Sequence, residues 1–327
     1  MHLTQEQRYT ISILLEKDYS LTKIAQIIGK NKSVISRELK RNRDSVTGNY
    51  NADLAQQKYV QRQKEKLRKK RFTDDVKEYV KEKLLDDWSP EQINQRAKKD
   101  HIECVSHETI YKFVWADKRN GGELHKHLRR QGRRYRKRGN LKDSRGIIKN
   151  RVSIDERPKI VDEKKRFGYF EIDTIIGRNH KGAILSINDR WSSLVWIRKL
   201  TGKNAKELAI KAVETLKDIR DKIYTITADN GKEFALHEII SKLLTVDFYF
   251  AHPYHSWERG ANENTNGLIR QYVPKGTDFK DITQEFLNKI QNKLNNRPRK
   301  RLDFDTPIEF LTKFGILTET NSVAFVT

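Results

Sequence analysis

The chain has 327 residues, 36% of them hydrophobic, with 67 Lys and Arg against 44 Asp and Glu, a formal net charge of +23. An excess of this size costs self-repulsion unless a polyanion neutralises it, so the expected partner is double-stranded DNA and not a membrane. The single cysteine, Cys104, excludes an intramolecular disulfide, and the polar start and the lack of a spanning apolar stretch favour a cytoplasmic, nucleoid-associated bacterial protein.

Residues 1–57 predict a helix-turn-helix DNA-binding domain. Thr4 to Gln7 has the form of a capping box, and two further helices are expected over 21–28 and 33–40, joined at Gly29. Gly permits the positive φ of a tight turn between two steeply packed helices. An ordinary helical hairpin is the alternative. The last helix would present five side chains to a major groove: Lys32, Ser33, Ser36, Arg37 and Lys40.

Residues 58–72 are polar and basic and predict a linker that is either an exposed helix or a hinge. A second helix-turn-helix-like domain is expected over 73–125. Ser89 and Pro90 form an N-cap with a proline at the first helical position, and Ser106 opens a further helix. The segment between these helices is long, so a purely structural three-helix unit is as good an interpretation as a second DNA reader.

Residues 126–160 predict a second basic linker, because ten Lys or Arg and a single acid fall between 126 and 145. Such a run cannot fold alone and is expected to order along DNA, where neutralised phosphates release counterions. A solvated tether is the alternative. The DNA contacts predicted here are Arg129, Arg130, Arg133, Arg134, Arg136, Lys137 and Arg138.

Residues 161–327 predict an α/β catalytic domain with C-terminal helices. Short runs rich in β-branched and aromatic residues alternate with helical patterns in the order β-β-β-α-β-α-β-α. This order is that of the RNase H-like fold, a mixed five-stranded sheet flanked by helices. The expected strands cover 167–176, 183–188, 194–200, 223–228 and 246–250, and the expected helices 205–219, 233–244, 262–272, 286–294 and 308–314.

Three acids occupy informative places in this domain. Asp173 lies in the middle of an apolar strand, Asp229 ends the fourth strand, and Glu263 opens the helix over 262–272. A carboxylate in a buried strand is expensive unless it is paired or binds a metal, and strand ends collect ligands. Carboxylates without His or Cys partners favour Mg²⁺ or Mn²⁺, two ions per site. Glu171, Glu233 and Glu258 are rival ligands, for which supporting roles are expected.

Other polar residues near these acids receive lesser roles. Arg270 lies two helical turns after Glu263 and on nearly the same face, where it would hold a DNA phosphate, and Lys275 is assigned to the same DNA surface. His252 and His255 are interpreted as loop residues near DNA and not as a metal pair.

The chain resembles the DDE transposases of the insertion sequence thirty family. The resemblance lies in residues 170–174, 227–234 and 258–272, and in 35–42, 88–93 and 296–300, so it runs through the whole chain. Thirty-three residues separate Asp229 from Glu263, which is the family's spacing. The resemblance implies that Asp173, Asp229 and Glu263 are the catalytic triad, that terminal inverted repeats are the DNA ends recognised, and that a circular element is an intermediate.

The predicted function is therefore that of a DNA transposase, which hydrolyses a strand at the element's end and joins the freed 3′-hydroxyl to a second phosphodiester. A homodimer or larger assembly is expected, because two ends must be held together. A helix-turn-helix transcriptional regulator would need the basic helices but not the three acids. An RNase H-like nuclease would have the acids but would not join strands.

Overall fold

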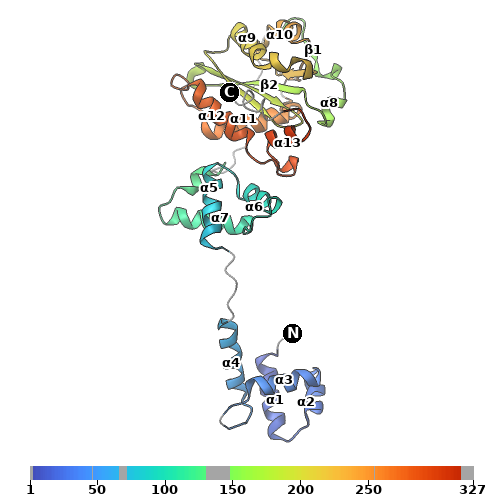
Figure 1. The fold of residues 1–327 in the computed structure, drawn as a ribbon, viewed down its shortest axis with the longest axis vertical. Coiled ribbons are helices and arrows are strands. Elements are labelled where there is room, and N and C mark those ends of the chain that lie inside the picture. The colour runs from blue at the N-terminus through green and yellow to red at the C-terminus, as the bar shows by residue number, and fades with distance from the viewer. Residues whose placement is uncertain (1–2, 46, 66–71, 130–147, 254, 318–327) are drawn as a thin grey trace. The chain divides into compact units, whose positions relative to one another are not determined.

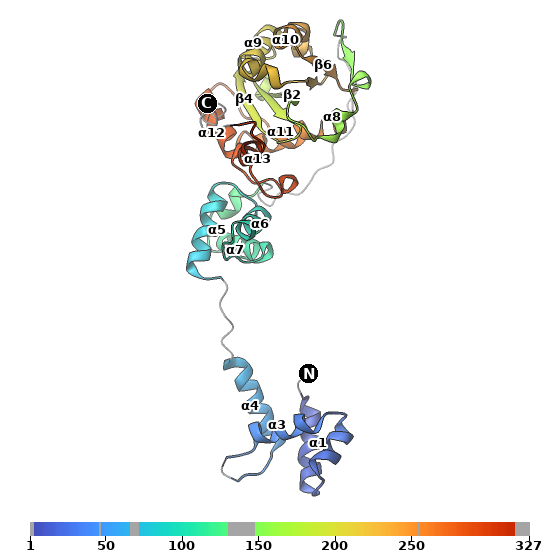
Figure 2. The same cartoon turned by 45° about the vertical axis from the view of Figure 1, so that its right-hand side comes forward.

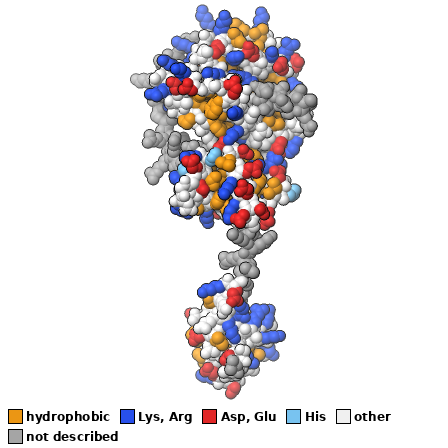
Figure 3. Space-filling model, turned by 60° about the vertical axis from the view of Figure 1, so that its left-hand side comes forward, with side chains coloured by type: hydrophobic (Ala, Val, Ile, Leu, Met, Phe, Trp, Pro, Cys, Tyr) orange, Lys and Arg blue, Asp and Glu red, His pale blue; other side chains and the backbone are white. Residues whose placement is uncertain are grey.

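The computed structural model describes residues 3–45, 47–65, 72–129, 148–253 and 255–317. The chain divides into two compact units, residues 1–71 and residues 72–327. On the face shown in Figure 3, Lys and Arg side chains are frequent on both units, and Asp and Glu side chains are interspersed among them. No described helix is both long enough and apolar enough to cross a bilayer.

The N-terminal unit is a bundle of four helices (Figure 1): α1 (Gln5–Glu16), α2 (Leu21–Ile28), α3 (Lys32–Asn42) and α4 (Ala52–Glu65). The capping box at Thr4 is present, and Gly29 ends α2 with a φ of 65°. Ile11, Ile24 and Ile35 are completely buried, so each of the first three helices contributes to one core. The helix-turn-helix fold predicted for this region is confirmed.

Helix α4 runs on into the segment interpreted as a basic linker. Ala52 and Ala55, three residues apart, are buried, and α4 packs against α1. Tyr59 places its ring 4.6 Å from the Arg8 guanidinium, which also makes a 2.7 Å buried ion pair with Glu38. The first half of the segment thus belongs to the N-terminal bundle, and residues 66–71 lie outside the described residues.

The second helical region is a three-helix unit: α5 (Asp74–Leu85), α6 (Pro90–Lys99) and α7 (His107–Arg119), followed by the short helix η1 (Leu124–His127). Ser89 forms a capping box with Gln92 in front of Pro90, and Ser106 caps α7, as predicted. Its core gathers buried residues from all three helices: Val76, Val80, Leu84, Ile93, Ala97, Val105, Ile110 and Val114.

A mixed six-stranded sheet forms the centre of the C-terminal region. Its order is β1-β6-β5-β2-β3-β4, with bounds β1 (Val152–Ser153), β2 (Tyr169–Ile176), β3 (Ala183–Asp189), β4 (Val195–Leu200), β5 (Thr225–Ala228) and β6 (Asp247–Phe250). The prediction of five strands was one short, because β1 has only two residues and lies in the predicted basic linker 126–160. It pairs in parallel with β6, Val152 opposite Tyr249.

Helices cover both faces of this sheet (Figures 1 and 2). The helices α9 (Ala205–Leu216) and α10 (His237–Leu244) pack on one face, and α11 (Gly260–Tyr272) and α12 (Gln284–Asn295) on the other. Side chains of a strand alternate between faces, so Phe170 and Ile172 point to α9 while Ile175 points to α11. The remaining helices are α8 (Ile160–Glu163), η2 (Ile154–Glu156), η3 (Arg178–His180), η4 (Lys217–Lys222), η5 (Lys232–Phe234), η6 (Ser256–Arg259), η7 (Lys300–Leu302) and α13 (Pro307–Lys313).

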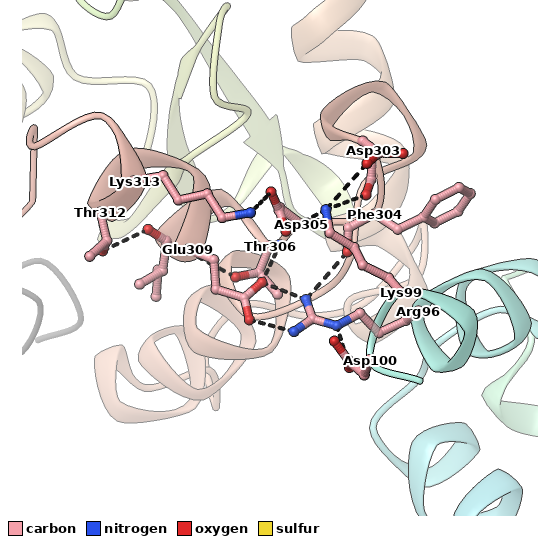
Figure 4. Close-up of polar contacts among 11 residues, drawn as sticks. Arg96, Lys99, Asp100, Asp303, Phe304, Asp305, Thr306, Glu309, Thr312 and Lys313 are labelled. Atoms are coloured by element: carbon pink, nitrogen blue, oxygen red, sulfur yellow. Dashed lines mark hydrogen bonds and ion pairs between the residues drawn. The ribbon is translucent and has the colours of Figure 1, made fainter. Parts of the chain in front are cut away.

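The second helical region is attached to the C-terminal part of the α/β region through ion pairs of α6 (Figure 4). The Arg96 guanidinium donates to both carboxylate oxygens of Glu309, at 2.5 and 2.7 Å, and to the Phe304 carbonyl. The Lys99 ammonium lies 2.7 Å from the carboxylate of Asp305, which also pairs with Lys313 on α13. These bonds of α6 join residues more than 200 positions apart and fix this helix on α13 and on the segment before it.

Candidate active site

Two strands bring Asp173 and Asp229 together. Strand β2 pairs in parallel with β5, Glu171 opposite Thr227, and the same register extended by two residues brings Asp173 level with Asp229. Asp229 follows the last residue of β5, and its carboxylate accepts a hydrogen bond from the Gly231 amide at 2.9 Å. Both side chains are mostly buried, with exposed fractions of 17% and 26%.

A seam of polar contacts fixes helix α11 over these strands. The Glu171 carboxylate accepts from the Asn262 backbone amide at 2.8 Å, at the helix N-terminus, where a negative charge is stabilised. The Asn266 side chain donates to Asp173 at 2.9 Å and accepts from Ser186 at 2.8 Å. Glu171 and Asp173 lie on the same face of β2, so this one strand bonds α11 at two places, Asn262 and Asn266, within the first two turns of the helix.

Glu263 occupies the first turn of α11, as predicted, and its side chain is exposed. It lies three residues before Asn266, and therefore on the side of the helix that reaches Asp173. The three acids nevertheless do not form a group with all ligand oxygens within 4.8 Å of one another; among the described residues, His252, His255 and Glu258 alone do so. The structure thus brings the two aspartates together, and the Glu263 side chain is exposed in the first turn of the helix that contacts Asp173.

The cation between the two aspartates is the Arg259 guanidinium. Its Nη1 lies 3.2 Å from the Asp173 carboxylate and its Nη2 lies 3.7 Å from the Asp229 carboxylate. The Arg259 side chain is itself only 12% exposed. The positive charge of the guanidinium compensates the negative charges of the two adjacent, mostly buried carboxylates. A divalent cation bound at the same place would compensate them in the same way.

Burial shapes the ionisation of this site. Burial raises the pKa of Asp173 above its usual range; the Arg259 guanidinium opposes this rise, and the neighbouring Asp229 adds to it. Burial also raises the pKa of Glu171, against the opposing charge of Arg190 and the hydrogen bond from Asn262. The charged forms of Asp173 and Glu171 therefore depend on neighbouring positive charge and hydrogen-bond donors.

Glu233 supports the site from the loop after Asp229. Its carboxylate accepts from the Thr174 hydroxyl at 2.7 Å and pairs with Lys203 at 3.1 Å. A Cβ at Gly231 would lie 2.6 Å from the Glu233 carboxylate and 2.9 Å from that of Asp229, so a larger residue would displace these carboxylates. Glu171, Glu233 and Glu258 are all engaged by protein donors, in keeping with the supporting roles expected of them.

Comparisons with known proteins place this architecture. A helix-turn-helix domain family model matches residues 1–42. The transposase of insertion sequence element IS4351 from Bacteroides fragilis is 56% identical over 324 residues, 99% of this chain and 98% of its own. The transposase InsI of element IS30C from Escherichia coli (strain K12) is 35% identical, covering 97% of this chain and 85% of its own. This chain belongs to the IS30 family of transposases.

Two solved structures are similar to the catalytic region of this IS30-family chain. The catalytic core domain of BIV integrase is 19% identical and covers 45% of this chain and 95% of its own, with a TM-score of 0.34. The HTLV-2 integrase catalytic core domain in complex with magnesium is 16% identical and covers 44% of this chain and 94% of its own, also with a TM-score of 0.34.

The DNA contacts predicted for this IS30-family chain fall into four groups, of which Arg270 is the last. On α3, all five predicted side chains, Lys32, Ser33, Ser36, Arg37 and Lys40, are exposed. Arg129 and Lys275 are exposed as well, and the Arg129 guanidinium donates to the Asn264 side chain on α11 at 3.0 Å. The others predicted in the basic run lie outside the described residues: Arg130, Arg133, Arg134, Arg136, Lys137 and Arg138.

Arg270 is engaged by the protein itself. Its guanidinium donates to the Ile176 carbonyl at 2.9 Å and, more weakly, to the carbonyls of Val273 and Pro274. Burial lowers the pKa of this guanidinium. These bonds tie the end of α11 to the end of β2, so the predicted phosphate contact would have to share Arg270 with a structural role.

Two residues of the site were not predicted from the sequence, Arg259 and Asn266. Both lie inside the segment 258–272 that carries the family resemblance, Arg259 four residues before Glu263 and Asn266 three residues after it. The helical spacing alone places Asn266 beside Glu263. Arg259 precedes the regular helix, in η6, so no periodicity indicates the direction of its side chain.

The histidines of the loop before α11 surround Glu258. The Glu258 carboxylate lies 2.8 Å from His252 Nδ1 and 3.3 Å from His255 Nδ1, and His252 Nε2 lies 2.9 Å from Asp155. Hydrogen bonds to Glu258 and Asp155 raise the pKa of His252. These contacts hold the loop against η2 immediately before the residues that approach the aspartates.

Proposed function

We propose that this IS30-family chain cleaves and joins DNA with divalent ions, Mg²⁺ or Mn²⁺, held by Asp173, Asp229 and Glu263. The observation that carries the proposal is the pair of adjacent, partly buried aspartates that take the Arg259 guanidinium as their counter-ion. Bound ions would lower the pKa of an attacking water or 3′-hydroxyl and stabilise the leaving oxygen. Oxygen ligands without sulfur favour these hard cations over zinc.

The chain's own residues would prepare this site in defined ways. Asn266 orients the Asp173 carboxylate, and Glu171 anchors the start of the helix that carries Glu263. Arg259 neutralises the aspartates before ions enter and would then be released towards a DNA phosphate. Closure of the exposed Glu263 side chain onto the two aspartates would complete the ligand set.

The remaining parts of the proposal concern DNA and assembly. Helix α3, in residues 1–57, would read the terminal inverted repeats, with 58–72 as a linker, 73–125 as a second DNA-binding domain and 126–160 as a second linker. The region 161–327 would carry out the chemistry. Holding two ends together would require a homodimer or larger assembly. The finer division and the individual DNA contacts are part of this proposal.

Asp173→Asn tests the proposal. The change keeps the shape of the side chain but removes a negative oxygen ligand, so metal-dependent cleavage and joining of labelled element ends should be abolished while binding of the ends persists. Asp218→Asn, an exposed residue of η4, is the matched control and should behave as wild type. Full cleavage by Asp173→Asn would defeat the assignment.

The products distinguish two other functions. A transcriptional regulator would bind the ends without cutting them in Mg²⁺ or Mn²⁺. A nuclease of the RNase H-like fold would yield nicks but no joined strands, whereas the proposed activity yields strand-transfer products.

A further inference from the structure

The most exposed large hydrophobic side chain among the described residues is Trp257, at 70%. It lies in η6, between the loop histidines and Arg259. Its ring centroid is 4.4 Å from that of His255, with the planes tilted by 33°, so the imidazole lies against one face of the indole. The high exposure leaves the rest of the indole turned to solvent. A Trp side chain carries a large apolar surface that folding normally buries, so its exposure here calls for a ligand.

The position of Trp257 limits what that ligand is. Trp257 and Arg259 are two residues apart, so their Cα atoms lie within about 7 Å. Arg259 in turn is 3.2 Å from the Asp173 carboxylate. Trp257 therefore lies next to the residue that contacts the two aspartates, at the entrance of the site in which the DNA phosphate would react.

The surroundings favour a nucleobase over an apolar protein surface. Trp257 lies two residues before Arg259, whose guanidinium would be freed for a DNA phosphate when ions neutralise the aspartates, in a chain of net charge +23 that attracts a polyanion. Every base offers a π-face to an aromatic side chain, whereas a paired base at the interior of a duplex has both faces covered by its neighbours. A base whose pairing is broken has a face to offer.

We propose that Trp257 is a stacking platform for an unpaired nucleobase at the DNA end undergoing cleavage. The inference rests on the proposed function and adds that the site binds a DNA end whose base pairs are open. With His255 behind it, the indole would hold a displaced base next to the phosphate that Asp173 and Asp229 serve. Trp257 would thus be a substrate-binding residue that favours ends with opened base pairs.

The test compares two DNA probes and measures their dissociation constants for the full-length protein in EDTA. One probe is the terminal inverted repeat of the element that encodes the chain, fully paired, and the other has its last three base pairs mismatched. Trp257→Ala should weaken binding of the mismatched probe by about 5- to 100-fold, the usual effect of losing one base stack. It should change binding of the paired probe less than about twofold, and Trp257→Phe should restore most of the loss.

Two controls protect the interpretation. Leu243→Ala removes another exposed apolar side chain, on α10, and should affect neither probe. Replacing each terminal thymine in turn by 5-iodouracil should give, on irradiation, a cross-link at Trp257 from one position only. Equal weakening of both probes, failure of Trp257→Phe to restore binding, or a changed oligomeric state of Trp257→Ala would overturn the proposal. Because EDTA removes the ions, the result is independent of the Asp173→Asn test of the catalytic site.

Discussion

The two helical regions share one local design and use it differently. Each has side-chain N-caps and a core drawn from three helices. In the N-terminal unit the middle helix, α2, leaves Lys23 and Gln26 exposed. In the second helical region the middle helix, α6, directs Gln92, Arg96 and Lys99 to α13 and the segment before it. The outer face of α6 therefore joins its helical region to the rest of the unit 72–327.

The largest expected effect is a difference in DNA affinity between variants of the two helical regions. Arg37 is exposed on α3, and Lys112 is exposed on α7, the corresponding helix of the second unit. We expect Arg37→Ala to weaken binding of element ends by at least about 10-fold, because an arginine at a base edge contributes about 1–3 kcal/mol. Lys112→Ala should cost about threefold or less if α7 meets only the DNA backbone.

Fluorescence anisotropy at several salt concentrations measures both effects. If Lys112 pairs with a phosphate, Lys112→Ala should lower the slope of log affinity against log salt by about one. Lys17→Ala, at the end of α1, removes one charge from an exposed position and is the control. A larger loss of affinity for Lys112→Ala than for Arg37→Ala would reverse the roles assigned to the units.

The next effect concerns stability. Arg96 makes a two-pronged bond to Glu309, whose side chain is 39% exposed, so we expect Arg96→Ala to lower the free energy of unfolding of residues 72–327 by about 1–2 kcal/mol. Unfolding of the N-terminal unit should be unchanged. Differential scanning calorimetry of the full chain measures both transitions. Arg119→Ala, at the exposed end of α7, is the control, and equal destabilisation by both variants would contradict the docking role.

The smallest expected effect is the pH dependence of the stability that the Arg96–Glu309 pair contributes. Burial raises the pKa of Glu309, but hydrogen bonds from Arg96 and the Thr306 amide outweigh it, so the pKa lies below its usual value. A carboxyl whose pKa is lower in the folded state than in the unfolded state, where it is about 4.3, stabilises the fold at pH values above the unfolded pKa. This stabilisation is lost as the pH falls through the folded pKa. The stability difference between wild type and Arg96→Ala should shrink below about pH 4, measured by urea unfolding. A constant difference down to about pH 3 would exclude this pair as its source.

Much of the fold followed from local patterns in the sequence. The capping residues Thr4, Ser89 and Ser106 and the turn at Gly29 predicted helix ends, because these signals act within a few residues. Runs of β-branched and aromatic residues predicted five strands, and the positions of Asp173 in the first strand and Asp229 at the end of the fourth predicted that they share a site. That a buried strand contained an acid was itself the signal for a site.

What could not be predicted depends on contacts between distant segments. Strand β1 is too short for any pattern, and it exists only because β6 offers an edge. The bond of Arg96 to Glu309 joins two charged residues that each look like ordinary solvent-exposed positions. Arg259 belongs to the same class, since nothing in its neighbours' spacing indicates that its guanidinium turns towards two strands.

The side-chain amide of Asn266 has one further consequence. Its nitrogen contacts the acid of the second strand and its oxygen contacts the hydroxyl of the third, so the helix, β2 and β3 meet at a single planar group. Any shift of the helix along its axis moves Glu263 and reorients Asp173 in the same step. Selection on the geometry of Glu263 is then also selection on the geometry of Asp173. The sequences of α11, β2 and β3 are therefore expected to vary together.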